Sequence, residues 1–155
     1  MLPKLMAALH RPVYERRLET LVKVISAHLA PEDKVLDVGC GSGALGARLV
    51  AENSARSVTV DGLEKHPRGG ESIHVISYPG ETFPLEDASY DVVILADVLH
   101  HERDPDKLLR EASRVSRRLV IIKDHQVNGP LAYARISLID WAANAPLRRP
   151  VSLSL

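Results

Sequence analysis

Val35-Leu-Asp-Val-Gly-Cys-Gly-Ser-Gly43 is the stretch that decides the fold of this 155-residue chain. A short apolar run over residues 34–38 stops at Gly39, and a helical pattern begins at Ala44 and ends at Glu52. This order predicts a strand, a glycine loop and a helix. Open α/β sheets bind ligands at such a loop, beyond the carboxyl end of the strand. Glycines there allow the backbone to adopt positive φ and to approach a ligand closely.

The rest of the chain predicts more strands alternating with helices. Helical periodicity occupies residues 14–30, and Asp104-Pro105 predicts the N-cap and first turn of another helix. The strand segments are rich in apolar and β-branched residues; they are residues 57–61, 72–78, 90–98 and 118–123. Alternation of this kind predicts the α/β class, with a Rossmann-like, doubly wound, mostly parallel sheet of about five strands and helices on both faces.

The length and the last residues predict how the chain is organised. At 155 residues we expect one domain, with an N-terminal helical segment over residues 1–30, a ligand-binding core over 33–125 and a C-terminal helix and tail over 126–155. Leu131, Leu138 and Trp141 predict a last helix over residues 130–143. The alternation of residues 151–155 predicts a short edge strand.

Charge and cysteine content exclude several classes of function. The chain has 20 Lys and Arg residues against 20 Asp and Glu residues, so we expect no nucleic-acid partner. One cysteine, Cys40, excludes an intramolecular disulfide and a multi-cysteine metal site, and no metal is expected. We also expect no membrane insertion, because no run of about 18 apolar residues occurs. A cytoplasmic location fits these features.

Two carboxylates near the glycine loop distinguish between the kinds of ligand that it could bind. Gly41-Ser-Gly43-Ala-Leu-Gly46 matches the G-x-G-x-x-G pattern of dinucleotide sites, so an NAD(P)-binding oxidoreductase is one reading. Asp61, 18 residues after Gly43, is expected to end the second strand and to accept hydrogen bonds from a ribose. Asp37, however, would repel a pyrophosphate and suits a cofactor that carries an ammonium and a sulfonium.

Four motifs together resemble class I S-adenosylmethionine-dependent methyltransferases. Residues 35–43 are similar to the first motif of that family, and Val58-Thr-Val-Asp61 to its second-strand acidic motif. Phe83-Pro-Leu-Glu-Asp-Ala-Ser-Tyr-Asp-Val-Val93 resembles the lead-in to strand four, and Asp97-Val-Leu-His-His101 the end of that strand. The resemblance extends over residues 33–123 and is nearest to methyltransferases of type 11, of the ubiquinone and menaquinone kind.

The resemblance implies S-adenosyl-L-methionine as cofactor, S-adenosyl-L-homocysteine as product and a small-molecule acceptor. Asp37 would lie near the amino group of the cofactor, Asp97 would border the methyl-transfer chamber, and Glu81 would be the candidate for adenine. His100 and His101 would lie where a general base is needed. The remaining residues expected at the cofactor belong to the loop and to the second strand; they are Gly39, Cys40, Gly41, Gly43, Asp61 and Gly62.

The sequence departs from the family after the fifth strand. Only 32 residues follow Lys123, too few for the predicted helix and the antiparallel hairpin with which the family's sheet ends. An unpaired sheet edge is an aggregation hazard, so we expect self-association through that edge. A shortened, inactive relative that binds the cofactor and acts through protein association is therefore the alternative to an active enzyme.

Overall fold

The computed structural model describes residues 2–124, with side chains from Tyr14 onward. A long helix, α1 (Leu2–Ser26), precedes the first strand, and two further α-helices, α2 (Ala44–Glu52) and α3 (Pro105–Val115), lie between strands. The strands are β1 (Lys34–Val38), β2 (Thr59–Glu64), β3 (Val75–Ser77), β4 (Tyr90–Ala96) and β5 (Ser116–Lys123). Short 3-10 turns occur at η1 (Ser54–Arg56) and η2 (Leu99–His101).

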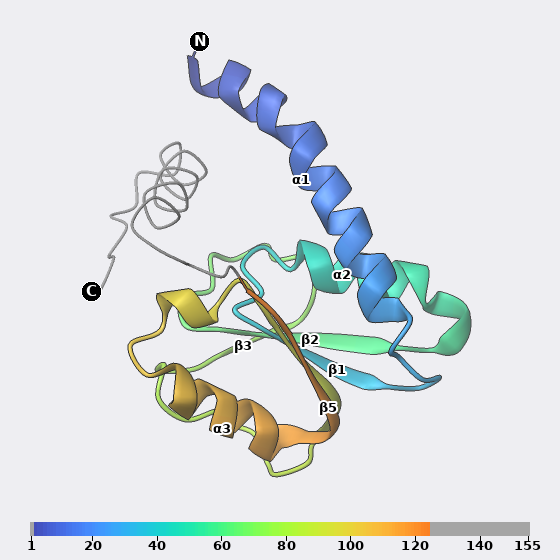
Figure 1. The fold of residues 1–155 in the computed structure, drawn as a ribbon, viewed down its shortest axis with the longest axis vertical. Helices are drawn as coiled ribbons and strands as arrows, with labels where there is room; N and C mark the ends of the chain where they lie inside the picture. The colour runs from blue at the N-terminus through green and yellow to red at the C-terminus, as the bar shows by residue number, and fades with distance from the viewer. Residues whose placement is uncertain (1, 125–155) are drawn as a thin grey trace.

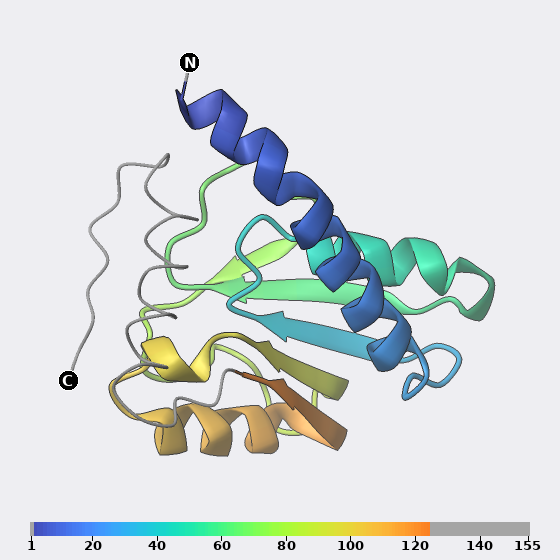
Figure 2. The same cartoon turned by 45° about the horizontal axis from the view of Figure 1, so that its top comes forward.

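All five strands form one parallel sheet in the order β3-β2-β1-β4-β5. The predicted α/β class and Rossmann-like architecture are therefore confirmed. The strand order reverses between β1 and β4, so the glycine loop after β1 lies at the position where such sheets bind ligands. Figures 1 and 2 show α1 crossing the strands on one side of the sheet.

Apolar side chains form one core on each face of the sheet. On one face, Ile25 of α1 and Leu49 of α2 pack against Val35 and Ile94. On the other, Leu108 and other residues of α3 pack against a second set of strand side chains, among them Leu36 and Leu95. Because neighbouring residues of a strand point to opposite faces, the two clusters alternate along β1 and β4.

The helix before β5 starts as predicted. Asp104 is the N-cap of α3, where its carboxylate accepts a 2.9 Å hydrogen bond from the Lys107 amide, and Pro105 follows in the first turn. The first helix differs, because α1 begins at Leu2 rather than at residue 14 and ends at Ser26. Turn hydrogen bonds continue to Leu29, which explains why the apolar period extends beyond the helix.

The second strand lies further along the chain than predicted. Residues 57–61 were expected, but β2 is Thr59–Glu64, and Asp61 stands in the middle of it, opposite Leu36 of β1. Asp61 is therefore not the acidic residue that ends this strand. That position belongs to Glu64.

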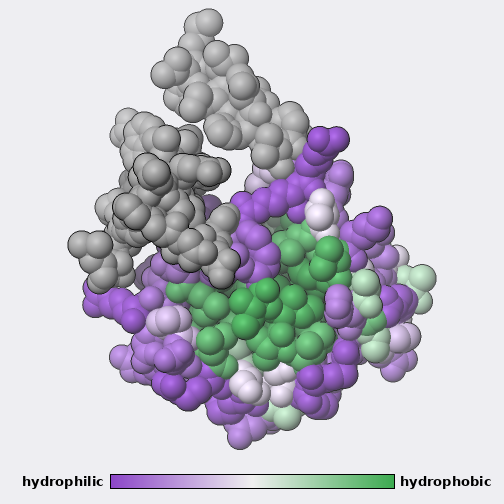
Figure 3. Space-filling model, viewed as in Figure 1, coloured by the Kyte–Doolittle hydropathy of each residue, from purple (hydrophilic) through white to green (hydrophobic). Residues whose placement is uncertain are grey.

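Three expectations fall on residues outside the described range: the C-terminal helix, the strand over 151–155 and the missing hairpin. Within the described residues no helix is long and apolar enough to cross a membrane. On the face of Figure 3, apolar side chains gather over β5 and beside α1.

Candidate functional site

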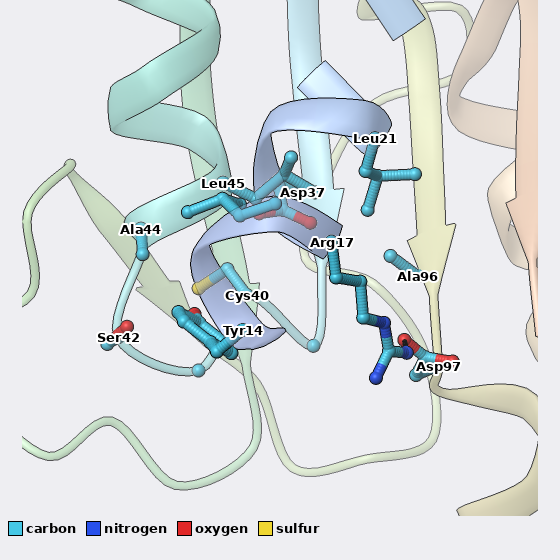
Figure 4. Close-up of a pocket in the computed structure, with 13 residues that line it drawn as sticks. Tyr14, Arg17, Leu21, Asp37, Cys40, Ser42, Ala44, Leu45, Ala96 and Asp97 are labelled. Carbon is cyan, nitrogen blue, oxygen red and sulfur yellow. Dashed lines mark hydrogen bonds and ion pairs between the residues drawn. The ribbon is translucent and has the colours of Figure 1, made fainter. Parts of the chain in front are cut away.

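A cavity of about 220 Å³ lies between the glycine loop and α1, at the carboxyl edge of the sheet. Figure 4 shows that Tyr14, Arg17 and Leu21 face it from the helix, while Cys40 and Ser42 belong to the loop beneath them. The other lining residues come from the ends of β1 and β4, the loop and the helices; they are Leu18, Asp37, Gly39, Gly41, Ala44, Leu45, Ala96 and Asp97. Of the residues expected at the cofactor, Asp37, Gly39, Cys40, Gly41 and Asp97 therefore meet here.

Asp37 places a buried carboxyl group at this cavity. Its relative exposure is 2%, and its Oδ2 atom has no hydrogen-bond partner among the described residues. Burial, and to a lesser degree the charge of Glu64, raises the pKa of Asp37 from 3.8 to about 7. A buried polar atom without a partner is costly, so this oxygen marks a position where a donor or cation would be stabilised.

The loop backbone is held open toward the cavity. Gly39, Gly41 and Gly43 have φ values of 69°, 56° and 75°, in the left-handed region that favours glycine. The amide of Gly39 donates a 2.7 Å hydrogen bond to the Leu63 carbonyl, which ties the loop to the end of β2. A Cβ at Gly39 would lie 2.7 Å from Val98 Cγ2, so the loop also fits closely against the segment after β4.

Glu64 is the acidic residue beside the loop. Its Oε2 atom accepts a 3.1 Å hydrogen bond from the Gly41 amide, and its Oε1 accepts one from the amide of Lys65 at 3.0 Å. The sequence analysis missed this residue. The continuation of the apolar pattern to Leu63 was the signal that could have found it.

Asp61, by contrast, lies away from the loop. It is absent from the cavity lining, and its carboxylate accepts a 2.9 Å hydrogen bond from the Tyr90 hydroxyl and lies 3.0 Å from His74 Nδ1. Tyr90 belongs to the core cluster on the α3 face, so Asp61 points to the face opposite the cavity. The expectation that Asp61 and the loop glycines meet at one ligand is therefore not supported by this geometry.

Gly62 supports the loop from below. A Cβ on this residue would lie 2.5 Å from Cys40 Sγ and 3.1 Å from Cys40 Cβ, so only glycine leaves room for the cysteine. Gly62 itself does not line the cavity. Burial, together with the charges of Asp37 and Glu64, raises the pKa of the Cys40 thiol to about 12, which favours the protonated form at neutral pH.

Asp97 directly follows β4, lines the cavity and forms ion pairs with two basic side chains. It has a positive φ of 58°, and its two carboxylate oxygens pair with Arg17 of α1 and with Lys123 at the end of β5. Figure 4 shows the Arg17 guanidinium reaching across to Asp97. The charge-assisted contact to Arg17 joins the helix to the carboxyl edge of the sheet.

Glu81 is not brought to this cavity. Its side chain is 82% exposed, and its Oε2 atom lies 4.0 Å from Lys107 Nζ. Both residues line a separate polar hollow beside the first turns of α3. His101 lines that same hollow. The expected adenine contact from Glu81 thus has no counterpart in the described arrangement.

His100 makes a second contact between the segment after β4 and the end of β5. Its Nδ1 lies 2.6 Å from Asp124 Oδ1, and its backbone amide donates a 3.3 Å hydrogen bond to Asp124 Oδ2. An ionised carboxylate can only accept, so this contact favours the tautomer of His100 with the proton on Nδ1. Asp124 was missed by the sequence analysis, because its partner is 24 residues away.

Comparison with known proteins agrees with this geometry. The family described as "Methyltransferase domain" matches residues 36–121, more than half of the chain and nearly the whole sheet. The chain belongs to the methyltransferase domain family.

Relatives of this methyltransferase domain act on different acceptors. The domain is 31% identical over 98 residues to 27-O-demethylrifamycin SV methyltransferase of Amycolatopsis mediterranei, a match that covers 55% of this chain and 35% of the relative. It is 30% identical over 102 residues to tRNA U34 carboxymethyltransferase of Saccharophagus degradans, covering 58% and 31%. The chain thus spans about a third of the length of these relatives.

Solved structures show the same fold. A SAM-dependent methyltransferase from Aquifex aeolicus superposes with a TM-score of 0.60 at 20% identity, over 90% of this chain and 87% of that one. At this identity the likeness concerns the fold of the methyltransferase domain alone.

Proposed function

We propose that this methyltransferase domain binds S-adenosylmethionine at the glycine loop and transfers its methyl group to a small-molecule acceptor. The observation that carries the proposal is the Asp37 Oδ2 atom, which is buried at the cavity without a partner among the described residues. An ammonium group of the cofactor would supply the missing donors and the missing charge.

The residues around the loop fit this cofactor better than a dinucleotide. Asp37 and Glu64 flank the loop from two strands, and their charges raise the pKa values of nearby groups. A pyrophosphate would be repelled by the Glu64 carboxylate and by the ionised form of Asp37, whereas a cofactor with an ammonium and a sulfonium would be attracted and would favour that ionised form. The NAD(P)-binding alternative is disfavoured for this reason.

Glu64 replaces Asp61 as the proposed partner of the ribose hydroxyls. It ends β2, on the same side of the sheet as the loop, and it already accepts a hydrogen bond from Gly41. Two ribose hydroxyls could donate to the free lone pairs of such a carboxylate. Asp61 is engaged by Tyr90 on the opposite face.

The cofactor, when bound, would supply a sulfonium methyl group for in-line displacement, in which the acceptor gains the methyl group and the thioether S-adenosylhomocysteine leaves. The protein then contributes mainly alignment and the exclusion of water. Asp37 would orient the amino end, and Tyr14 and Leu21 of α1 would cover the cavity. If the acceptor carries a proton, His100 is the proposed base, and Asp124 would orient its ring through Nδ1.

The acceptor is proposed to be a small molecule, in the cytoplasm. The formal net charge of zero favours this over a nucleic acid, although two relatives are named for tRNA. The contacts of Asp37 and Glu64 concern the cofactor and not an acceptor, so a cofactor-binding protein without turnover is the second candidate.

Calorimetric titration with S-adenosylhomocysteine tests the proposal, with NAD as the control ligand. Micromolar binding of S-adenosylhomocysteine alone, abolished by Asp37→Leu, is the expected result. Binding of NAD with equal affinity would overturn the cofactor class. Cofactor binding without methyl transfer in a broad acceptor screen would favour the second candidate.

A further inference from the structure

An apolar groove of about 580 Å³ runs between α1 and β5, outside the cofactor cavity. Its aliphatic lining comes from one side of the helix and from the end of the strand; it is Leu21, Val24, Ile25, Ile121 and Ile122. Val24 is 53% and Ile122 50% exposed, and Figure 3 shows the apolar area over β5 and beside α1. An exposed apolar hollow of this kind is typical of a surface that another segment or molecule covers.

The charges at the groove do not select an ionic occupant. Arg17 and Lys123 line it at the carboxyl edge of the sheet, but both form ion pairs with Asp97. Apart from these two residues, Arg16 and Thr20, the lining is aliphatic. The groove is therefore complementary to an apolar surface, such as the apolar face of a helix.

The chain itself leaves β5 at this groove. Lys123 is the last residue of β5 and lines the groove, so the residues that follow start at its carboxyl-edge end. Residues 125–129 form a connection that contains Asn128-Gly129, a pair typical of turns, and Pro130 follows it. Five residues span at most about 17 Å, so the segment after them begins close to the groove.

The segment after this connection matches the groove in character and in length. The sequence predicts a helix over residues 130–143, outside the described part of the chain, with Leu131, Leu138 and Trp141 on one side. From Leu131 to Trp141 a helix rises about 15 Å. The part of α1 that lines the groove, residues 16–25, rises about 14 Å.

We propose that the groove binds residues 130–143 of the same chain, packed as a helix with its apolar side against α1 and β5. The inference is independent of the proposed methyltransferase function. Because Arg17 and Leu21 line both the groove and the cavity, the docked segment would support α1 where it covers the cofactor site.

The course of α1 gives the register of the two helices. Arg17 lies at the carboxyl edge, and Ser26 accepts a 2.9 Å hydrogen bond from Asn53, which follows α2 at the opposite edge. A segment that enters at Lys123 and follows the groove runs in the same direction as α1. Leu131 would then lie level with Arg17, and Leu138, seven residues later, level with Val24.

The covalent connection favours this segment over a second copy of the chain. A short linker gives a tethered segment a millimolar effective concentration, whereas a second molecule in a micromolar sample is about a thousandfold more dilute. For equal contacts, the segment of the same chain therefore occupies the groove.

The single tryptophan of the chain, Trp141, reports on this contact in the full-length protein. Its emission should lie at shorter wavelength in the native protein than in urea, and Val24→Asp should shift it at least halfway toward the value in urea. The matched control is Val50→Asp on α2, at a 37% exposed position outside the groove, which should leave the emission unchanged. Circular dichroism checks that both variants keep the native fold.

An emission that is the same in the native protein and in Val24→Asp would overturn the proposal, as would equal shifts in the two variants. A native mass that falls from dimer to monomer in Val24→Asp would also overturn it, because the groove would then join two copies of the chain.

A pair of cysteines provides a second measurement that does not depend on an introduced charge. A disulfide needs Cα atoms within about 7 Å of each other. In a Cys40→Ala background, Val24→Cys combined with Leu138→Cys should form a disulfide within one molecule under mild oxidation. Val50→Cys combined with Leu138→Cys should not. A disulfide that forms only between two molecules, or equally in both pairs, would overturn the proposal.

Discussion

The amide of Gly41 donates a 3.1 Å hydrogen bond to Glu64 Oε2, which joins the glycine loop to the end of the neighbouring strand. The contact places a carboxylate beside the loop from a residue that is 23 positions away in the chain. The two acidic residues of β2 thus lie on opposite faces of the sheet: Glu64 is on the side of the loop, and Asp61 is on the other side.

Glu64→Gln should weaken the binding of S-adenosylhomocysteine more than Asp61→Asn does. A hydrogen bond to a charged group contributes about 1.5–3 kcal/mol, so we expect a loss of roughly 10- to 100-fold for Glu64→Gln. Asp61→Asn keeps a partner for Tyr90 and should change the affinity less than threefold. Calorimetry on both variants checks the prediction. A larger loss of affinity for Asp61→Asn than for Glu64→Gln would indicate that Asp61 binds the ribose.

Asp37→Asn should make the stability of the ligand-free protein less dependent on pH. Between pH 4 and 7 the native carboxyl group holds a proton that the unfolded chain has lost, since its pKa rises from 3.8 to about 7 on folding. Raising the pH through this window therefore lowers the free energy of unfolding, by up to about 4 kcal/mol from this residue.

Urea denaturation at pH 4.5 and pH 7.5 measures this effect. The stability advantage of Asp37→Asn over the native protein should be larger at pH 7.5 than at pH 4.5. An advantage that is the same at both values, in a variant with a native circular dichroism spectrum, would show that Asp37 ionises as freely in the folded protein as in the unfolded chain.

Gly62→Ala should destabilise the fold by about 1–3 kcal/mol, the usual cost of inserting a methyl group into a packed site. The added Cβ would meet Cys40 Sγ at 2.5 Å. Cys40→Ala removes that sulfur atom, so the double variant should regain part of the loss. Thermal unfolding of the four proteins checks this, and strictly additive effects would contradict the proposed contact.

Asp124→Ala should change the tautomer of His100. With Asp124 present, the proton is expected on Nδ1, which lies 2.6 Å from the carboxylate. Without it, the neutral imidazole should shift toward the Nε2–H form. Nitrogen chemical shifts of the labelled ring at pH 8 report the tautomer directly, and an Nε2–H form in the native protein would exclude Nε2 as the acceptor of a proton.

The sequence predicted the elements around the loop well and the second strand poorly. Residues 34–38 and 44–52 are the observed bounds of β1 and α2, because a glycine run marks the boundary between them. Asp and Gly are frequent in turns, so the pair Asp61-Gly62 indicated that the strand ends there. The glycine instead continues the strand and leaves room for Cys40.

The remaining site residues depend on contacts that no local pattern carries. Arg17 meets Asp97 across 80 positions of the chain, and it is one of several charged residues on an exposed helix. Glu81 had the right chemistry and a suitable place in the sequence, yet the loop after β3 turns it toward Lys107. Tertiary packing decides these positions, so local sequence could give only candidates.

The buried carboxyl group of Asp37 links the site to the proton concentration of its surroundings. Near neutral pH a share of the ligand-free molecules carries the proton, and a cation arriving at Oδ2 would displace it into the buffer. The heat of cofactor binding would then contain the ionisation enthalpy of whichever buffer receives that proton. The heats measured in phosphate and in Tris would therefore differ. Dividing that difference by the difference between the ionisation enthalpies of the two buffers would give the number of protons released for each cofactor bound.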